Sequence, residues 1–318
     1  MEQKVRFHLP GLRYNYPLNM YWVSLLEQYP EYFRPNIEIG SFFGTFPYAI
    51  WNGGRLMHDD QCDSDYVRGV IQAMNSKGIP VRYTFTNPCL VEEDFKDPYC
   101  NFLMQAANNG MNEVMVFDPK LEAYLRDKYP NFAYNSSTCK EIRNTEELNA
   151  EIEKPYKYVV LDYNLNNRWD LLENVQHKEK LEVLINTLCI PNCPRRGEHY
   201  KNIGRNERII LENRKLPMDQ KKPIEPWYCE YGDNNCIHNI KGYPTFISVE
   251  DIYEKYMPAG INNFKIEGRS AYIFSLIDTY CYYMLKEECV GEARLQIIKN
   301  LEKSGVIAVR KPRPAMWP

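Results

Sequence analysis

The stretch L-E-V-L-I-N-T-L-C-I-P-N-C-P-R-R, residues 181–196, guides the interpretation of the whole chain. It begins with the apolar run Val183–Ile185, continues through a polar pair, and ends in two cysteines, Cys189 and Cys193. An apolar run bounded by polar residues is typical of a buried strand. Two prolines disfavour a regular helix in the thiol loop, because proline lacks a donor N–H and fixes φ. The stretch therefore predicts a strand that ends in thiols.

Seven further runs of strand length lie on either side of this one. The eight predicted strands are Val5–Leu9, Ile37–Phe43, Val81–Asn87, Glu113–Asp118, Asn131–Ser136, Tyr158–Asn164, Leu181–Thr187 and Asn263–Glu267. Helical patterns between them predict helices at Leu18–Tyr29, Ser64–Ser76, Asn101–Asn109, Pro119–Lys128, Thr145–Glu153, Asp170–Lys180 and Ser248–Tyr256. The span 194–245 is the exception, because it has few periodic apolar positions and several helix-breaking residues.

Eight short strands alternating with helices favour an α/β fold, a parallel (β/α)8 TIM-like barrel. A doubly wound open sheet also alternates, but eight units in about 270 residues fit a closed barrel better. We expect one barrel domain over residues 1–318, with 194–245 as an insertion after the seventh strand. Two further helices, Arg269–Lys286 and Gly291–Lys303, are expected in the segment 269–318, where they would complete and cover the barrel.

Composition is ordinary for a soluble globular protein, with 44% hydrophobic and 25% charged residues. A net charge of -3 disfavours binding of RNA through a broad basic surface. The N-terminal residues M-E-Q-K-V-R-F-H lack a signal-peptide core, and no apolar run reaches the membrane-spanning length of about 18 residues. We expect a cytoplasmic protein whose ten cysteines bind metal or pack in the core rather than form disulfides.

Polar residues follow the predicted strands at the end where barrels of this type place their active sites. They are His8, Glu38, Ser41, Thr86, Asn87, Asp118, Asn135, Ser136, Asp162, Asn164, Asn186, Thr187, Lys265, Glu267 and Arg269. We expect them to converge on one cavity. Asp118 is equally well explained as a helix cap, and His8 as a hydrogen-bonded core residue. Strand alternation turns Glu38 away from its apolar neighbours, and inside the barrel it would need a partner such as Arg6 or Lys265.

Four cysteines form a candidate metal centre. Cys189 and Cys193 follow the seventh strand, whereas Cys229 and Cys236 lie in the long insertion. A long irregular segment needs a cross-link to be ordered. One centre held by four thiolates explains both positions. Zinc knuckles usually have about two to four residues between paired cysteines, and the second pair here has six. An iron–sulfur cluster therefore fits better than zinc, with zinc and simple buried thiols as the alternatives.

Two motifs together resemble a known family. Residues 186–196, N-T-L-C-I-P-N-C-P-R-R, followed by His199, resemble the N-x-x-C-x-x-x-C-P-x-R segment of the collagenase-like (U-type) peptidases. That family includes the iron–sulfur proteins of anaerobic ubiquinone hydroxylation. F-K-I-E-G-R, residues 264–269, resembles the K-I-E-G-R segment near the end of the family's barrel domain. The order and separation of the motifs fit, with a cysteine pair between them.

The resemblance implies a (β/α)8-like fold with a metal cofactor beside its substrate cavity. The implied [4Fe–4S] ligands are Cys189, Cys193, Cys229 and Cys236, and the implied cavity residues are Lys265, Glu267 and Arg269. In several branches it also implies oxygen-independent hydroxylation of a quinone precursor or an RNA base. The first half of the chain lacks the tight cysteine signature of the large RNA-modifying members, which disfavours RNA as the substrate.

Three functions follow from these features. The first is an iron–sulfur enzyme or enzyme subunit that modifies an organic small molecule in the barrel mouth by hydroxylation or related redox chemistry. Glu267 or Glu38 would move protons there, Arg269 with Lys265 would hold an anionic group, and His8 is a further candidate. The second is a non-catalytic iron–sulfur or zinc subunit that pairs with a paralogous protein. The third is a U-type-peptidase-like hydrolase, although neither a Ser/His/Asp set nor an H-E-x-x-H motif is identifiable.

Overall fold

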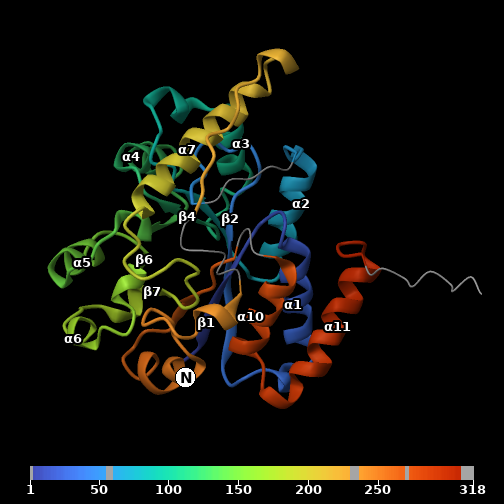
Figure 1. Cartoon of the computed structure of the whole chain (residues 1–318), viewed down its shortest axis with the longest axis vertical. Helices are drawn as coiled ribbons and strands as arrows, with labels where there is room; N and C mark the ends of the chain where they lie inside the picture. Colours follow the sequence, from blue (N-terminus) through green and yellow to red (C-terminus); the bar gives the residue numbers. More distant parts are fainter. Residues whose placement is uncertain (1–2, 55–59, 230–235, 269–271, 309–318) are drawn as a thin grey trace, which may run out of the picture.

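A closed barrel of eight parallel strands forms the centre of the molecule (Figure 1). In this computed structural model, which describes residues 3–54, 60–229, 236–268 and 272–308, the strands pair in chain order and β8 closes on β1. The strands are β1 (Val5–Pro10), β2 (Ile37–Gly44), β3 (Val81–Phe85), β4 (Glu113–Val116), β5 (Ala133–Ser136), β6 (Tyr158–Val160), β7 (Leu181–Leu184) and β8 (Asn263–Lys265). All eight predicted strands are present, and the predicted barrel is confirmed.

Helices connect the strands and surround the barrel (Figure 1). They are α1 (Tyr16–Gln28), α2 (Ser64–Asn75), α3 (Pro98–Ala106), α4 (Pro119–Lys128), α5 (Thr145–Ile152), α6 (Trp169–Leu172), α7 (Arg196–Asn213), α8 (Ile237–Ile240), α9 (Val249–Asp251), α10 (Ile273–Met284) and α11 (Val290–Lys303). The π-helical turn η7 (Ile252–Tyr256) continues α9. Within the described ranges, none of the helices has both the length and the apolar character that a membrane span requires.

The connection between β6 and β7 differs from the predicted helix over Asp170–Lys180. Helix α6 covers only four residues, and His177 adopts a left-handed backbone with φ of 47°. Asn149 of α5 explains the break: its side-chain amide donates to the carbonyl of Asn174, and its Oδ1 accepts from the N–H of Gln176. Because these backbone groups bind α5, they do not complete a helix of their own.

The span 194–245, predicted as an irregular insertion, contains the largest difference. Residues Arg196–Asn213 form α7, a regular helix of 18 residues. Its buried residues are Arg196, Asn202, Ile203, Gly204, Asn206 and Glu207. They repeat at helical spacing, but most of them are polar. A search for apolar periodicity therefore could not reveal this helix.

Helix α7 lies across the carboxyl end of the barrel (Figure 1, yellow). In its first turn Arg196 donates to the carbonyl of Thr138, at 2.9 Å, and pairs with Asp162 at 2.6 Å. These partners follow β5 and β6. Toward its other end, Glu207 accepts a 2.6 Å hydrogen bond from Asn52, which follows β2. A single helix thus joins loops from opposite sides of the barrel mouth.

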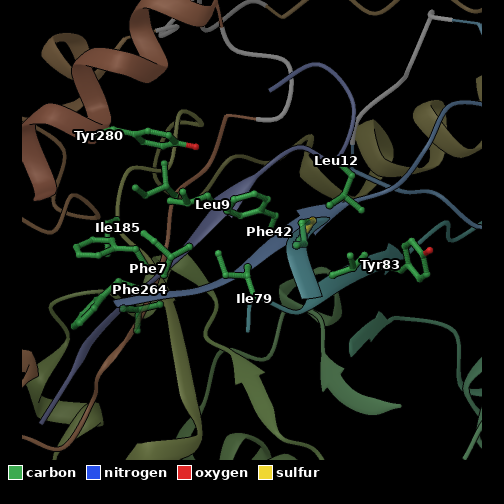
Figure 2. Close-up of a cluster of buried hydrophobic side chains, with 14 of the residues drawn as sticks. Phe7, Leu9, Leu12, Phe42, Ile79, Tyr83, Ile185, Phe264 and Tyr280 are labelled. Carbon is green, nitrogen blue, oxygen red and sulfur yellow. The ribbon is translucent and has the colours of Figure 1, made fainter. Parts of the chain in front are cut away.

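The apolar core lies between the barrel and its helices (Figure 2). Figure 2 shows Phe7, Leu9, Phe42, Ile185 and Phe264, all fully buried. The ring of Phe7 lies 6.0 Å from that of Phe264 and 6.4 Å from that of Tyr283 in α10, so both phenylalanines face outward, toward the helices. Since side chains alternate along a strand, His8 and Lys265, the next residue on each strand, point into the barrel.

Candidate active site at the carboxyl end of the barrel

A cavity of about 80 Å³ lies at the carboxyl end of the barrel. Strand residues that line it are Phe43, Thr84, Met115, Leu184 and Lys265. Residues from the loops and from α7 complete the lining: Gly54, Thr86, Ser137, Thr138, Cys139, Tyr200, Glu267 and Gly268. One water molecule needs about 10–15 Å³ of such space, so the cavity can hold several waters or one small substrate group. Of the polar residues predicted to converge, Thr86, Lys265 and Glu267 are part of this lining.

Strand β8 and the residues directly after it supply both charged groups of the cavity. Lys265 and Glu267 are two positions apart, so they project to the same side of the chain. The N–H of Glu267 donates to Asn186 Oδ1 at 2.7 Å, and Asn186 Nδ2 donates back to the carbonyl of Glu267 at 3.0 Å. The N–H of Leu188 donates to Glu267 Oε2 at 3.0 Å. The loop after β7 therefore fixes both the backbone and the carboxylate of Glu267.

Lys265 is the inner charged residue of the cavity, with 6% of its surface exposed. Its Nζ lies 3.4 Å from Glu182 Oε1, 3.4 Å from Met115 Sδ and 4.1 Å from the centre of the Phe43 ring. A carboxylate and an aromatic face each favour a charged ammonium group. The cavity therefore combines a buried cation with the carboxylate of Glu267.

His8 is buried inside the barrel and is not one of the residues that line the cavity. Its Nδ1 lies 2.9 Å from Ser41 Oγ, and its Nε2 lies 3.4 Å from Glu182 Oε2. Burial, and then the nearby guanidinium of Arg82, lower the pKa of His8 to about 3. The imidazole is therefore neutral at pH 7, and its contacts match the core residue that was the alternative interpretation.

The structure separates Glu38 from the cavity. Arg6 Nε donates to Glu38 Oε1 at 3.0 Å, and the two side chains are 33% and 41% exposed. The pair lies near the start of β1 and β2, at the amino end of the barrel. Arg6 is thus the partner that Glu38 finds, and the predicted convergence with the other polar residues does not occur. Arg269 lies outside the described residues.

Several strand-end residues hold loops rather than line the cavity. Asp118 Oδ1 accepts from the N–H of Leu121 at 2.8 Å, which makes it the N-cap of α4, the alternative function considered for it. Asp162 Oδ1 accepts from the N–H of Asn164 at 2.9 Å, and its Oδ2 accepts from Arg196 at 2.6 Å. These carboxylates organise the mouth of the barrel without entering the cavity.

Two of the four cysteines proposed as metal ligands lie together. The thiol of Cys189 is within hydrogen-bonding reach of Cys193 and of the Tyr163 hydroxyl. Burial, and then the neighbouring Cys193, raise the pKa of Cys189 to about 11. Cys229 is exposed, and Cys236 is the N-cap of α8. Across the described residues, no three side chains of His, Cys, Asp or Glu converge as metal ligands would.

The described residues therefore assemble only half of the predicted [4Fe–4S] site. Such a cluster takes four protein ligands, as does tetrahedral zinc, and two adjoining thiols do not meet that need. Residues 230–235, between Cys229 and Cys236, lie outside the described part of the chain. The four-cysteine centre, with iron–sulfur or with zinc, stays a prediction.

Residues of α7 form part of the site that sequence patterns did not reveal. Tyr200 lines the cavity, and its hydroxyl accepts a 3.0 Å hydrogen bond from Arg196 Nε. The Arg196 guanidinium also lies 4.5 Å from the centre of the Tyr163 ring. Burial raises the pKa of Tyr200, so the phenol keeps its proton at neutral pH. Arg196 and Tyr200 are four residues apart, a spacing that places two side chains on the same face of a helix. This spacing was the sequence feature that could have indicated their shared role at the site.

Together, the fold and the cavity define a (β/α)8-barrel protein with a candidate active site at the carboxyl ends of its strands, where enzymes of this fold carry theirs. No known family model matches the chain. It is similar to the protein named uncharacterized protease MJ1657, from Methanocaldococcus jannaschii, with 27% identity over 183 residues. The match covers 54% of this chain and 49% of the archaeal protein. The chain thus spans about half the length of the curated relative it matches.

Among solved structures, the chain is similar to one described as the structure of the U32 peptidase Mk0906. The TM-score is 0.45 with 12% sequence identity, over 84% of this chain and 93% of that one. The similarity to a named protease agrees with the resemblance to the collagenase-like peptidases that residues 186–196 and 264–269 carry.

Proposed function

We propose that the chain is a hydrolase that cleaves a peptide-like amide bond at the carboxyl-end cavity, the hydrolytic alternative given by the sequence. The observation that carries the proposal is that Lys265 and Glu267 line the same cavity from the same side of the chain. Water attack on a carbonyl needs a base for the water and a positive group for the oxygen. The similarity to a named protease supports an amide as the bond that is cleaved.

In this mechanism Glu267 is the general base. It removes a proton from a water molecule as the water oxygen bonds to the carbonyl carbon, while Lys265 stabilises the negative charge that develops on the carbonyl oxygen. The carbon–nitrogen bond then breaks, and Glu267 returns the proton to the leaving amine. One water is consumed, an acid and an amine are released, and no oxidant or reductant is needed.

The surroundings of the pair support this chemistry. Hydrogen bonds exchanged with Asn186 and donated by the N–H of Leu188 orient Glu267 before a substrate arrives, and such preorganisation avoids a cost during the reaction. Thr84 and Thr86 also line the cavity, and a threonine hydroxyl can bind the polar backbone of a substrate. The small volume indicates that one short substrate residue enters.

The test is hydrolysis of a diverse mixture of synthetic peptides, with new chain ends identified by mass spectrometry. We expect the wild-type protein to cleave a subset of the peptides. Glu267→Gln should lower the rate by about 10²–10⁴-fold, as expected for loss of a general base. Lys265→Met should lower it by about 10²–10³-fold, as expected for loss of an oxyanion partner.

Glu93→Gln is the matched control, because it makes the same chemical change at an exposed position that is not part of the cavity lining. It should cleave at the wild-type rate. Wild-type turnover by folded Glu267→Gln, or no cleavage of any peptide by the folded wild-type protein, would contradict the proposal.

The adjoining thiols of Cys189 and Cys193 favour a second candidate, an iron–sulfur hydroxylase or a non-catalytic iron–sulfur or zinc subunit. Purification without air, followed by analysis of iron, acid-labile sulfide and zinc, tests it. About four irons per chain, lost in Cys193→Ala, would support a [4Fe–4S] centre. Metal-free wild-type protein that hydrolyses peptides would count against this candidate and for the hydrolase.

A further inference from the structure

The interior of the barrel is charged where barrels of this type usually carry branched apolar side chains. Four strand residues with polar or charged side chains lie in the barrel interior, each at most 1% exposed: His8, Arg82, Glu113 and Glu182. An unpaired charge in such a place costs several kcal/mol or more, on the order of its lost hydration. Each of the charged groups therefore needs an oppositely charged partner, and the ion pairs show which charge stabilises which.

The charges alternate in sign from one end of the barrel to the other. Lys157 Nζ, on a side chain that is 41% exposed, lies 2.5 Å from Glu113 Oε1. Arg82 Nε lies 2.6 Å from Glu113 Oε2, and Arg82 Nη1 contacts Glu182 Oε2. Glu182 Oε1 lies 3.4 Å from Lys265 Nζ, at the cavity. This series, which we call the charge ladder, links Lys157, Glu113, Arg82, Glu182 and Lys265.

We propose that Glu182 is a positioning residue of the cavity: it keeps Lys265 charged and directed at the substrate at neutral pH. The role of Lys265 toward substrate rests on the proposed function, whereas its charge state does not. The titratable groups around Lys265 are His8 of β1, Arg82 of β3, Glu182 of β7, Glu267, Cys139 and Tyr200. Of these groups, Glu182 pairs with Lys265 through Oε1, which lies 3.4 Å from the Lys265 Nζ.

The contacts of Glu182 fit this role. Burial opposes its ionisation, but the positive charges of Arg82 and then Lys265 hold the pKa of Glu182 well below its usual range, so it stays a carboxylate at neutral pH. Its Oε1 has no hydrogen-bond partner among the described residues, which leaves the ion pair with Lys265 as the interaction of that oxygen. His8 is neutral and therefore does not compete for Glu182 as a second cation.

Removal of the Glu182 charge has a definite consequence. Arg82 cannot lose its proton, because a guanidinium stays charged at any ordinary pH. Lys265 would then lose the Glu182 carboxylate that lies between it and the buried guanidinium of Arg82, and burial also favours the neutral amine. The pKa of Lys265 should therefore fall in Glu182→Gln, and the amine should become a nucleophile at neutral pH.

The experiment measures the reactivity of the Lys265 amine, because only a neutral amine is alkylated. The full chain is treated with formaldehyde and a borane reductant at pH values from about 6 to about 11, a range that includes the usual lysine pKa of ~10.4. Dimethylation of Lys265 is then quantified by peptide mass spectrometry. Exposed Lys299 is the internal reference. We expect wild-type Lys265 to be labelled only at alkaline pH. In Glu182→Gln its labelling at pH 7.5 should rise by about tenfold or more, equivalent to one pKa unit.

Glu113→Gln is the matched control, since Glu113 is also a buried carboxylate paired with Arg82, and Arg82 and Glu182 lie between it and Lys265 in the charge ladder. It should change Lys265 labelling much less, and Glu182→Asp should restore most of the wild-type profile. Identical profiles for the wild-type protein and Glu182→Gln would overturn the proposal. So would rapid labelling of wild-type Lys265 at pH 7, a result that needs no variant to fold.

This readout is independent of peptide hydrolysis. If Lys265 reactivity shifts in Glu182→Gln and no peptide is cleaved by any protein, the proposed function fails while the charge ladder stands. If peptides are cleaved and the labelling profiles coincide, the function stands and the positioning role of Glu182 is wrong.

Discussion

The buried imidazole of His8 makes the free energy of unfolding depend on pH in the acid range. In the folded protein its pKa is about 3, because burial and then Arg82 oppose its protonation, whereas an unfolded histidine titrates near pH 6.5. Between these values the unfolded chain binds a proton that the folded chain does not bind. The free energy of unfolding therefore rises with pH through this window: the full stability is present above pH 6.5 and declines as pH falls toward 3.

His8→Gln should remove this contribution. Urea unfolding at several pH values between 7 and 4.5 should show a shallower loss of stability than in the wild-type protein, by up to about 1.4 kcal/mol per pH unit. His177→Gln is the control, because His177 has the same chemistry but lies 53% exposed at the surface. Parallel stability curves for the wild-type protein and His8→Gln would show that the buried ring has no such effect.

At the residue scale, sequence identified the charged pair of the cavity but not the charges below it. Lys265 and Glu267 could be found because strand alternation puts them on one side of a strand end. Glu38 was misplaced although it is the second residue of the predicted strand Ile37–Phe43, a position at the amino end of the barrel and not at the end that carries the cavity. Glu182 lies between apolar Leu181 and Val183, and nothing in the sequence indicates that its ion-pair partners come from β3 and β8.

At the scale of single elements, α7 is fixed to the barrel by close packing of its backbone. Gly204 lies so near Asn87, just after β3, that a methyl group at this position would overlap the Asn87 side-chain oxygen and lie 3.2 Å from Cys89 Cβ. Asn87 cannot easily yield, because it is 1% exposed and its amide donates to the carbonyl of Ile50 at 2.7 Å. The glycine therefore sets how closely α7 approaches the mouth of the barrel.

Gly204→Ala should consequently destabilise the protein by about 1–3 kcal/mol, the usual cost of overpacking a buried contact. Gly197→Ala, in the same helix, is the matched control, because the nearest atom to its added methyl group is Glu141 Oε1 at 3.5 Å. That variant should be neutral or more stable by up to about 1 kcal/mol, since alanine favours helix over glycine. Urea unfolding followed by circular dichroism compares the two, and equal effects would contradict this account of the α7 contact.

Strands and helices whose buried residues are apolar and regularly spaced could be predicted from the sequence. Helix α7, whose regularly spaced buried residues are mostly polar, could not. The strands were found because their outward faces are apolar, as at Phe7 and Phe264. Helix α7 was missed because it packs through asparagine, arginine, glutamate and glycine. The predicted helix at 170–180 was too long because Asn149, a distant residue in sequence, binds its backbone groups.

At the scale of the whole molecule, charged side chains lie at both ends of the barrel and in the interior between them. The amino end carries the exposed pair of Arg6 and Glu38 and the outer lysine of the charge ladder, Lys157. The carboxyl end carries the cavity, with Lys265 and Glu267, beneath loops that α7 joins together. The charge ladder connects the two ends through the interior, so the polar interior and the candidate active site form one continuous electrostatic unit.

The most direct test of the hydrolase proposal is a single-turnover cleavage of a peptide substrate in ¹⁸O-labelled water, with the wild-type protein compared with Glu267→Gln. We predict that the new carboxyl group of the wild-type product carries one oxygen from the solvent, and that Glu267→Gln forms this product at least about 100-fold more slowly. Equal rates for the two proteins, or a product without solvent oxygen, would contradict the claim that Glu267 activates water at the carboxyl end of the barrel.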